Sequence, residues 1–212
     1  MAARASSPRS ERGRFIVIDG IDGCGKSTQA ARLVAALAER GTAPPLHVRE
    51  PGGTELGERL RAILLDRALE LSPAVETLLF AAARARLLEE KIAPALAAGR
   101  HVVCERFHPS TFAYQGVAGG IGGERAHELH AAWAGEPKPD LVQLLDHPPE
   151  RALARRARPG DRIEDKGLEF QRRVAAGFRR YAELDPSVVR VDADRSADDV
   201  ARQVLAEASR AL

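Results

Sequence analysis

Residues Gly20 to Ser27 read Gly-Ile-Asp-Gly-Cys-Gly-Lys-Ser, which is a complete G-x-x-x-x-G-K-[ST] phosphate-binding pattern. Glycines at these positions allow backbone N–H groups to turn inward around a polyphosphate. The lysine of such a loop reaches the β- and γ-phosphates of a nucleoside triphosphate, and the hydroxyl after it binds the accompanying Mg²⁺. The pattern therefore predicts a triphosphate-binding loop with contacts from Gly20, Ile21, Asp22, Gly23, Cys24, Gly25, Lys26, Ser27 and Thr28.

The sequence on either side of this loop supports the interpretation. Residues 15–19 before it are apolar and predict a buried strand, and residues 26–40 after it predict a helix with apolar side chains at Leu33, Val34 and Leu37. A strand–loop–helix order places the phosphates at a helix N-terminus, where the dipole favours anions. These flanks argue against the alternative, a glycine-rich turn with a solvated lysine.

Short apolar segments alternate with helical patterns along the chain. The predicted strands are 15–19, 46–49, 101–105, 141–146 and 188–192, and the predicted helices are 26–40, 55–66, 73–98, 124–134, 149–158, 164–184 and 197–211. This alternation indicates an α/β fold of the P-loop three-layer sandwich type, with a five-stranded parallel sheet covered by helices on both faces. Residues 116–123 include five glycines and predict a flexible loop.

Length and composition limit the classes of protein to which this chain could belong. The 212 residues suit one domain over residues 14–212, preceded by a disordered leader over residues 1–13. A net charge of +2 gives no reason to expect nucleic-acid binding, and no apolar run is long enough to span a membrane. Two cysteines provide no disulfide framework and suit a cytoplasmic protein.

Charged segments follow the predicted strands. Arg49-Glu50-Pro-Gly-Gly follows the second strand, Glu105-Arg106-Phe107 the third, and Asp192-Ala-Asp194 the fifth. Because ligands bind at the carboxyl ends of parallel strands, we expect these segments and the phosphate loop to converge on one crevice. Arginine binds phosphate oxygens in pairs, so Arg49 and Arg106 are candidate phosphate ligands, with ordinary surface ion pairs as the alternative.

Five segments identify a closer relationship. They are Arg49-Glu-Pro-Gly-Gly-Thr54, Phe80-Ala-Ala-Ala-Arg84, Glu105-Arg-Phe107, Ser110-Thr-Phe-Ala-Tyr-Gln-Gly116 and Asp161-Arg-Ile-Glu164. In this order they resemble the thymidylate kinases, which phosphorylate dTMP to dTDP with Mg²⁺ and ATP. The resemblance implies a cytoplasmic homodimer that acts on dTMP and ATP. The alternatives are a kinase for another deoxynucleotide or deoxynucleoside, and a nucleotide-binding protein without turnover.

The resemblance also assigns residues to dTMP. Arg49 and Arg106 hold its phosphate, Phe80 stacks on the thymine, and Arg84 donates to O4, which favours thymine or uracil over cytosine. Core packing alone remains the alternative for Phe80, and packing without a sugar contact remains one for Tyr114. The full implied dTMP site consists of Asp22, Arg49, Glu50, Phe80, Arg84, Arg106, Thr111, Tyr114 and Gln115.

An attacking phosphate oxygen is already anionic, so the reaction needs no general base and depends on positioning and charge neutralisation.

The basic segment 155–164 is similar to the closing lid of the family, although a solvated basic helix end is the alternative. Arg158 is the first candidate for the lid's catalytic arginine, and Arg162 is expected at ATP. The resemblance implies catalytic roles for Lys26, Glu105, Arg106, Arg156 and Arg158, and metal contacts from Asp22, Ser27 and Glu105.

The chain departs from the family pattern at Glu105, where many relatives have aspartate; the extra methylene changes the distance to a metal or an arginine. Cys24 lies near a predicted helix N-terminus, which lowers a thiol pKa and suggests an oxidation-sensitive site. His127 and His130 share a helical spacing and are interpreted as surface groups rather than metal ligands.

Overall fold

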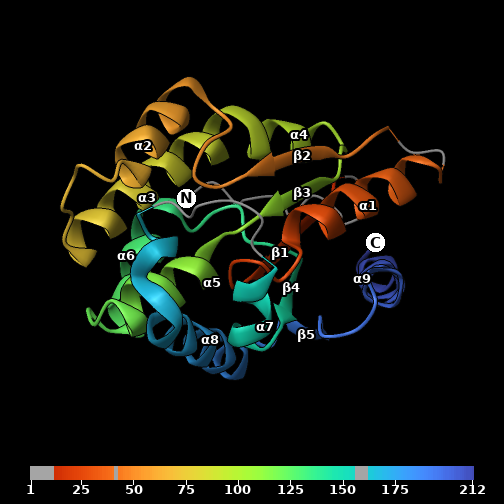
Figure 1. The fold of residues 1–212 in the computed structure, drawn as a ribbon. Helices are drawn as coiled ribbons and strands as arrows, with labels where there is room; N and C mark the ends of the chain where they lie inside the picture. Colours follow the sequence, from red (N-terminus) through yellow and green to blue (C-terminus); the bar gives the residue numbers. More distant parts are fainter. Residues whose placement is uncertain (1–11, 41–42, 156–161) are drawn as a thin grey trace.

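The computed structural model of the protein describes residues 12–40, 43–155 and 162–212 (Figure 1). Five strands form one sheet in the order β2-β3-β1-β4-β5, and every neighbouring pair is parallel. Their bounds are β1 (Phe15–Gly20), β2 (Leu46–Arg49), β3 (Val102–Glu105), β4 (Leu141–Asp146) and β5 (Val188–Asp192). The predicted strands are thus confirmed to within one residue at each end.

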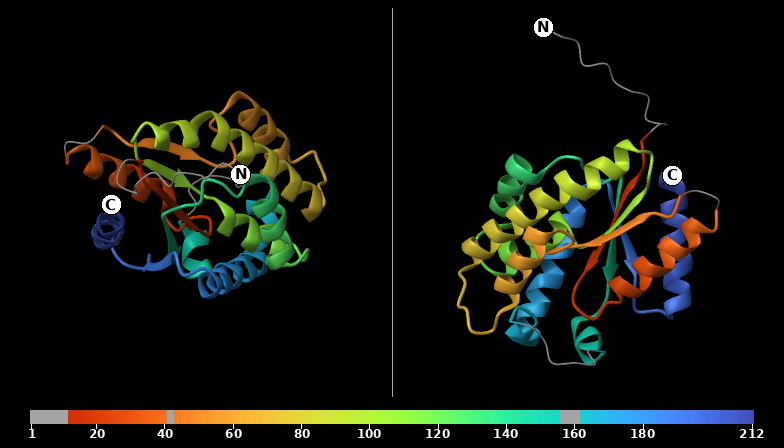
Figure 2. Two further views of the ribbon diagram at one scale, coloured as in Figure 1. Left: turned by 180° about the vertical axis from the view of Figure 1, so that it is seen from behind. Right: turned by 90° about the horizontal axis from the view of Figure 1, so that it is seen from above.

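Helices cover both faces of this sheet, which confirms the predicted three-layer α/β architecture. α1 (Lys26–Ala38) and α9 (Ala197–Ala211) contact each other and form one layer. The opposite layer contains α3 (Pro73–Leu87), α5 (His108–Thr111), α6 (Gly123–Ala134) and α8 (Gly167–Leu184), with α2 (Glu55–Leu65) packed on α3 (Figure 2). The carboxyl ends of the strands open between the layers, at the edge where the phosphate loop begins.

The centre of the sheet is the most apolar part of the protein. β1 pairs with β3 on one side and β4 on the other, and all six of its residues are buried. Continuous burial explains the unbroken apolar sequence, because a central parallel strand is covered on both faces. Each large apolar side chain buried in this way contributes about 1.5–3 kcal/mol to stability. The sheet is therefore a rigid base for the loops at its carboxyl edge.

The predicted helix over 73–98 is interrupted. After α3 the chain forms a π-helical turn, η1 (Leu88–Ile92), and then α4 (Ala93–Ala97), which contains Pro94. A proline inside a helix cannot donate its backbone hydrogen bond, and its ring clashes with the carbonyl four residues earlier. The π turn before Pro94 accommodates this defect without ending the helical path.

The prediction of a flexible loop over residues 116–123 is largely wrong. Residues 112–118 form a π-helical segment, η2 (Phe112–Ala118), that continues α5, and Gly116 is buried. A Cβ on Gly116 would lie 2.8 Å from Gly123 Cα, and one on Gly177 would lie 2.8 Å from Ala113 Cα. These glycines permit close packing of η2 against α6 and α8 rather than flexibility, and only residues 119–122 form the connection.

The ends of the predicted segments also differ. Arg12 donates to Asp140 at 2.7 Å and Gly13 donates to the carbonyl of Leu96 at 2.9 Å, so these two residues of the expected leader belong to the domain. Residues 1–11 lie outside the described residues. The predicted helix over 149–158 is present as α7 (Pro149–Ala154), and a 3₁₀ turn, η3 (Glu164–Lys166), precedes α8.

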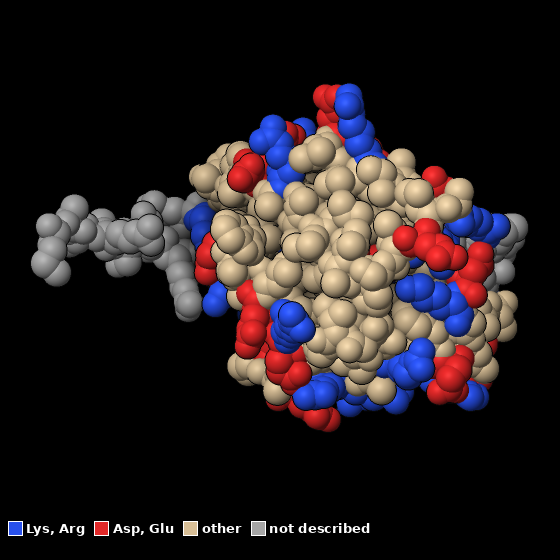
Figure 3. All heavy atoms as spheres, turned by 90° about the vertical axis from the view of Figure 1, so that its left-hand side faces the viewer, with Lys and Arg blue, Asp and Glu red and all other residues tan. Residues whose placement is uncertain are grey.

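One face of the molecule is mostly uncharged. It lies over α2 and α3 (Figure 3). These two helices carry four exposed apolar side chains, those of Leu56, Ile63, Val75 and Leu78. Among the described helices, none combines the length and the apolar character that crossing a membrane requires.

Candidate active site

A cavity of about 370 Å³ opens at the carboxyl edge of the sheet. It joins the phosphate loop to the ends of β2 and β3, to α3 and to η2. Three of the four segments expected to converge therefore do so. The fourth, Asp192–Asp194, is absent from the lining because β5 lies on the other side of β1 from β2 and β3, with β4 between them; Asp194 instead pairs with Arg151. The expected site residues in the lining are Asp22, Gly23, Gly25, Lys26, Ser27, Thr28, Arg49, Glu50, Phe80, Arg84, Glu105, Arg106, Thr111, Tyr114 and Gln115.

The phosphate loop adopts the conformation that its glycines predict. Gly25, at the N-cap of α1, has φ 99°, and Gly23 has φ 82° with its Cα facing the Ala152 carbonyl so closely that a Cβ would lie 2.1 Å from that oxygen. Lys26 is buried, and its Nζ donates to the carbonyls of Gly20 at 3.0 Å and Ile21 at 2.8 Å. The loop thus presents the start of α1 and a lysine to one end of the cavity.

Cys24 does not support the oxidation hypothesis. Its side chain belongs to the hydrophobic core, and burial raises the pKa of its thiol despite the nearby charge of Lys26. A buried thiol with a raised pKa is a weak nucleophile. The position near a helix N-terminus misled the prediction because the side chain points into the protein.

Asp22 is the centre of a cluster of donors. Its carboxylate accepts from the Arg106 guanidinium and from the Tyr114 hydroxyl at 2.7 Å, and it lies 3.8 Å from Lys26 Nζ. Burial alone would raise the pKa of Asp22, but Arg106, Lys26 and the Tyr114 hydroxyl outweigh it and lower the pKa to about 2. The structure therefore places Asp22 and Tyr114 as partners of Arg106, with Asp22 turned toward cations.

Arg106 owes its position to an unusual backbone. Its φ of 66° is left-handed, which is uncommon for a residue with a side chain. Asp19, at the end of β1, holds the following turn by accepting from the backbone N–H of Phe107 at 3.0 Å and from the Ser110 hydroxyl at 2.7 Å. The fixed turn directs the Arg106 guanidinium into the cavity beside the phosphate loop.

Glu105 bridges the loop and β2. One carboxylate oxygen accepts from the Ser27 hydroxyl, and the other lies 2.9 Å from Nε2 of His47. Burial alone would raise the pKa of Glu105, but hydrogen bonds from His47 and Ser27 outweigh it and lower the pKa. With its extra methylene, the carboxylate of Glu105 thus reaches the Ser27 hydroxyl directly. A hydroxyl and a charged carboxylate are hard oxygen ligands of the kind that Mg²⁺ takes, so this pair fits the expected metal.

Arg84 is held rigidly at the opposite end of the cavity. It is 1% exposed, and its Nε and Nη2 both donate to Glu50 Oε2 at 2.7 and 2.5 Å. Its guanidinium also lies over the Phe107 ring, 4.7 Å from the centroid. Burial raises the pKa of Glu50 to about 7, against the attraction of Arg84. Glu50 therefore lines the cavity and also holds Arg84 in place.

His130 was expected on the surface, and this expectation is wrong. The side chain is buried, and Arg84 Nη1 donates to its Nδ1 at 2.7 Å. An arginine can only donate, so His130 must accept and be neutral. Burial, followed by the charge of Arg84, lowers the pKa of His130 and favours that neutral form. Helical spacing alone could not show that α6 turns this residue toward α3.

Aromatic and polar side chains complete this end of the cavity. Phe80 is half-buried, packs against the core and lines the cavity one helical turn from Arg84, so core packing does not exclude a contact with a ligand. Thr111 accepts from Arg84 at 3.4 Å, and Gln115 donates to Glu76 at 2.9 Å. Arg61 and Leu65 also line the cavity and belong to no motif recognised in the sequence, whereas Ile163, a third lining residue, lies in the segment Asp161-Arg-Ile-Glu164.

Arg49 and Arg106 both line the cavity, at the ends of the neighbouring strands β2 and β3. The Arg49 side chain is exposed and makes neither an ion pair nor a hydrogen bond with the described residues, which disfavours the surface ion-pair alternative. Two arginines that flank a phosphate loop form a cationic centre suited to a second phosphate.

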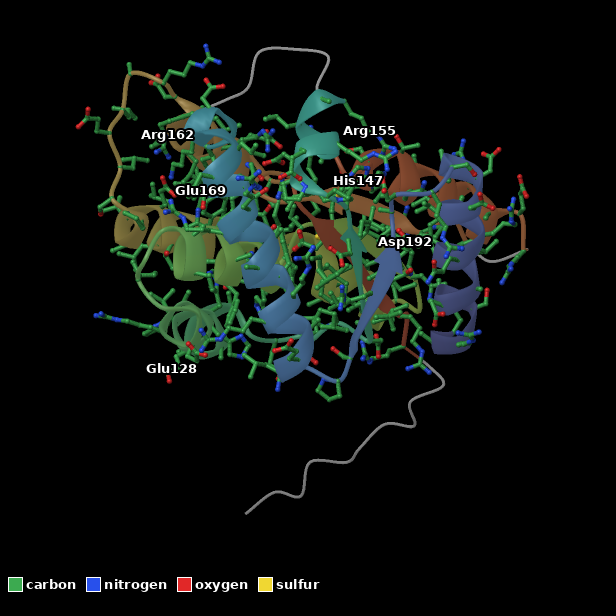
Figure 4. The ribbon with its side chains drawn as sticks, turned by 60° about the horizontal axis from the view of Figure 1, so that its bottom comes forward. Glu128, His147, Arg155, Arg162, Glu169 and Asp192 are labelled. Atoms are coloured by element: carbon green, nitrogen blue, oxygen red, sulfur yellow. The ribbon has the colours of Figure 1, made fainter. Side chains whose placement is uncertain are left out.

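The segment expected to form a lid is described only at its two ends. Arg155 at the end of α7 and Arg162 before η3 lie on the same side of the molecule (Figure 4). Arg162 donates to Glu76 at 2.7 Å and to the Leu64 carbonyl at 2.8 and 3.1 Å, which anchors it against α2 and α3. This position does not support the expected ATP contact. Arg156 and Arg158 lie outside the described residues.

Comparisons with known proteins agree with this geometry. The family model described as thymidylate kinase matches residues 18–204. A thymidylate kinase of Synechococcus sp. (strain JA-2-3B'a(2-13)) is 47% identical, over 90% of this chain and 91% of its own. The thymidylate kinase of Deinococcus radiodurans is 42% identical, over 93% and 97%.

A solved structure extends the comparison to the fold. The crystal structure of thymidylate kinase from Ehrlichia chaffeensis superimposes with a TM-score of 0.75 at 31% identity, covering 93% of this chain and 99% of that protein. The solved structure matches nearly the full length of both chains. Residues 18–204, which the family model matches, include the phosphate loop, the ends of β2 and β3 and the helices that enclose the cavity. The chain therefore belongs to the thymidylate kinase family.

Proposed function

We propose that the protein transfers the terminal phosphoryl group of ATP to the phosphate of dTMP, forming dTDP and ADP. The observation that carries this proposal is the single cavity that joins a phosphate loop to Arg49 and Arg106 and then to Phe80 and Arg84. A phosphoryl donor at the loop and a phosphorylated acceptor at the two arginines would meet inside it.

At the donor end, the loop from Gly20 to Thr28 binds the ATP phosphates through its backbone and the start of α1. Lys26 has two carbonyl partners within its own loop, and we propose that it exchanges them for phosphate oxygens. Arg158, with Arg156 as the second candidate, supplies further positive charge from the lid. These cations neutralise the charge that develops on the transferred group.

Ser27 and Glu105 are the residues proposed to hold Mg²⁺, Glu105 directly or through a water molecule. Among the described residues, no group of three histidine, cysteine, aspartate or glutamate side chains forms a metal site, which suits an ion that takes the rest of its ligands from phosphates and water. When bound, Mg²⁺ neutralises phosphate charge and orients the donor. Asp22 is less suited to this role because it already pairs with Arg106.

At the acceptor end, Arg49 and Arg106 bind the dTMP phosphate, and Asp22 holds Arg106 in place. Phe80 stacks on the thymine, and Arg84, fixed by Glu50 and His130, donates to O4. Thr111 and Gln115 lie at the base edge, and Tyr114 lies between base and phosphate. Leaving a buried donor unpaired is costly, so a base with an amine at position 4 is disfavoured.

The chemistry needs no proton-abstracting residue because the attacking phosphate oxygen is already anionic. The contribution of the protein is to hold two anions in line and to reduce their repulsion. A kinase for a nucleoside would have no use for two arginines at this position, and a non-catalytic nucleotide-binding protein would need no cationic acceptor site. These arginines therefore favour a phosphorylated acceptor and turnover.

A coupled ADP-release assay with Mg²⁺ and ATP tests the proposal, with dTMP, dUMP, dCMP, dGMP and thymidine offered in parallel. We expect turnover with dTMP and at least about a hundredfold lower kcat/KM with dCMP, the range that an unpaired buried polar group supports. Equal ADP release with every acceptor, or none with any of them, would contradict the proposed function.

We further propose that the protein is a homodimer and acts in the cytoplasm. The uncharged face lies over α2 and α3, the helices that carry the exposed Leu56, Ile63, Val75 and Leu78, and contiguous apolar faces mark association sites. The two cysteines are free and buried, as suits a reducing compartment. Nucleic acid and membrane are not expected among its partners.

A further inference from the structure

Glu76 on α3 is a buried carboxylate that lies directly behind the base end of the cavity. Its side chain is 1% exposed, and both of its oxygens are occupied. Oε1 accepts from Arg162 Nη1 at 2.7 Å and from Lys166 Nζ at 3.3 Å. Oε2 accepts from the side-chain Nε2 of Gln115 at 2.9 Å. A buried carboxylate is costly unless it is paired and hydrogen-bonded, and Glu76 meets both conditions.

This contact fixes the orientation of the Gln115 carboxamide. An ionised carboxylate can only accept hydrogen bonds, so the NH₂ group of Gln115 must face Glu76. The amide oxygen then points away from Glu76. Gln115 lines the cavity, and no described residue donates a hydrogen bond to its Oε1. The side chain therefore presents an acceptor, and not a donor, to a ligand at this end of the cavity.

An acceptor at this place distinguishes pyrimidine bases. N3 of thymine carries a hydrogen and donates, whereas N3 of cytosine has a lone pair and accepts. A fixed amide oxygen accepts a hydrogen bond from N3 of thymine. Opposite N3 of cytosine the same oxygen faces another lone pair, which leaves two buried acceptors unsatisfied. A glutamine free to rotate its amide could satisfy either base, so the discrimination depends on whatever prevents that rotation.

We propose that Glu76 is a specificity-determining positioning residue, which holds the acceptor side of Gln115 toward the nucleobase. The inference rests on the proposed function, because it takes the base of dTMP to lie beside Gln115. Arg162 and Lys166 contribute indirectly: they occupy Oε1 and leave Oε2 for the amide. Arg162 is itself fixed by the Leu64 carbonyl, and Lys166 lies 4.9 Å from the centroid of the Phe170 ring.

The test replaces the carboxylate by an amide of the same size. Glu76→Gln can donate as well as accept, so the Gln115 amide is no longer forced into one orientation. We expect the ratio of kcat/KM for dTMP to that for dCMP to fall at least about tenfold, while the KM for ATP changes less than about twofold. Glu89→Gln, the same substitution at an exposed ion pair on η1, should leave the ratio unchanged.

A double-mutant cycle separates this role from a structural one. Gln115→Met removes the amide at similar size and should itself reduce the dTMP/dCMP ratio. If Glu76 acts through Gln115, the double variant should have the ratio of Gln115→Met alone, because the second change has nothing left to orient. An unchanged ratio in Glu76→Gln, or additive losses in the double variant, would overturn the inference. An unchanged ratio in Gln115→Met would instead count against the proposed base site.

A structure of the unaltered protein with dTMP keeps the test independent of whether Glu76→Gln folds. The inference requires Gln115 to bridge the two partners, with one amide atom about 2.7–3.2 Å from N3 and the other still on Glu76. N3 of thymine is a donor, so the atom beside it must be the amide oxygen. A Gln115 side chain that contacts only one of the two partners would overturn the inference.

Discussion

Arg106 combines an unfavourable backbone conformation with a side chain proposed to bind the acceptor phosphate. It is the sole non-glycine residue with a positive φ in the part of the chain that the structure describes, and it places the charge proposed to bind the acceptor phosphate. A left-handed backbone costs a side-chain-bearing residue roughly 1–2 kcal/mol. Asp19, which holds the turn through Phe107 and Ser110, and Asp22, which pairs with the guanidinium, offset this cost.

Two substitutions separate the charge from the backbone strain. Arg106→Ala and Arg106→Gly both remove the guanidinium, so both should lower kcat/KM for dTMP by about a hundredfold or more. They differ only by a Cβ in a left-handed conformation, and we expect the glycine variant to be more stable than the alanine variant by about 1 kcal/mol in urea unfolding. Because glycine normally destabilises, an alanine variant of equal or greater stability would show that this backbone is not strained.

The sequence could predict the residues whose role depends on a local pattern. The phosphate loop, Arg49, Arg106 and the pair Phe80 and Arg84 lie in short motifs, and all of them line the cavity. His130 and Glu76 have no such motif. Their roles depend on α6 and α3 packing so that each side chain meets a partner many residues away, and a periodicity of side chains along one helix cannot show which partner that is.

Among the elements, η2 shows how a glycine pattern can mislead. The strands and long helices were predictable because burial on both faces of a sheet, or on one face of a helix, leaves a regular apolar repeat. Glycine has two uses that the sequence does not distinguish: conformational freedom and close approach. Here Gly116 and Gly177 serve the second use, and η2 is clamped between α6 and α8.

This clamp predicts the effect of a single methyl group. A Cβ at Gly177 would lie 2.8 Å from Ala113 Cα and 3.1 Å from Val117 Cβ, so Gly177→Ala must push η2 away from α8. Overpacking of this size costs about 1–3 kcal/mol, partly offset by the better helix propensity of alanine. Because η2 carries Tyr114 and Gln115, we expect the KM for dTMP to rise severalfold in steady-state assays, together with a lower melting temperature.

The neighbouring residue provides a matched control. Ala176 is exposed on the same turn of α8, so Ala176→Gly should cost about 1 kcal/mol through helix propensity without touching η2. Its melting temperature should fall while its KM for dTMP stays constant. Equal KM values in the two variants and the unaltered protein would mean that η2 tolerates the displacement and that its packing on α8 does not position the site.

At the scale of the whole molecule, the site and the proposed dimer face share one helix. α3 presents Phe80 and Arg84 to the cavity, holds Glu76 buried behind it, and presents Val75 and Leu78 to solvent. An apolar residue such as Leu78, 57% exposed in the single chain, is costly to leave in water and is removed from it when a second copy packs on this face. Association would then also stabilise the helix that carries Phe80 and Arg84, the residues proposed to bind the base.

The oligomeric state tests this arrangement through two leucines of nearly equal exposure. Leu78→Glu places a charge in the middle of the proposed interface and should convert the protein to a monomer in sedimentation velocity at micromolar concentration, because a buried unpaired charge is expensive. Leu184, 58% exposed at the end of α8, lies on another part of the surface, so Leu184→Glu should remain dimeric. A dimer that persists in Leu78→Glu, or an unaltered protein that sediments as a monomer, would contradict the assignment of this face.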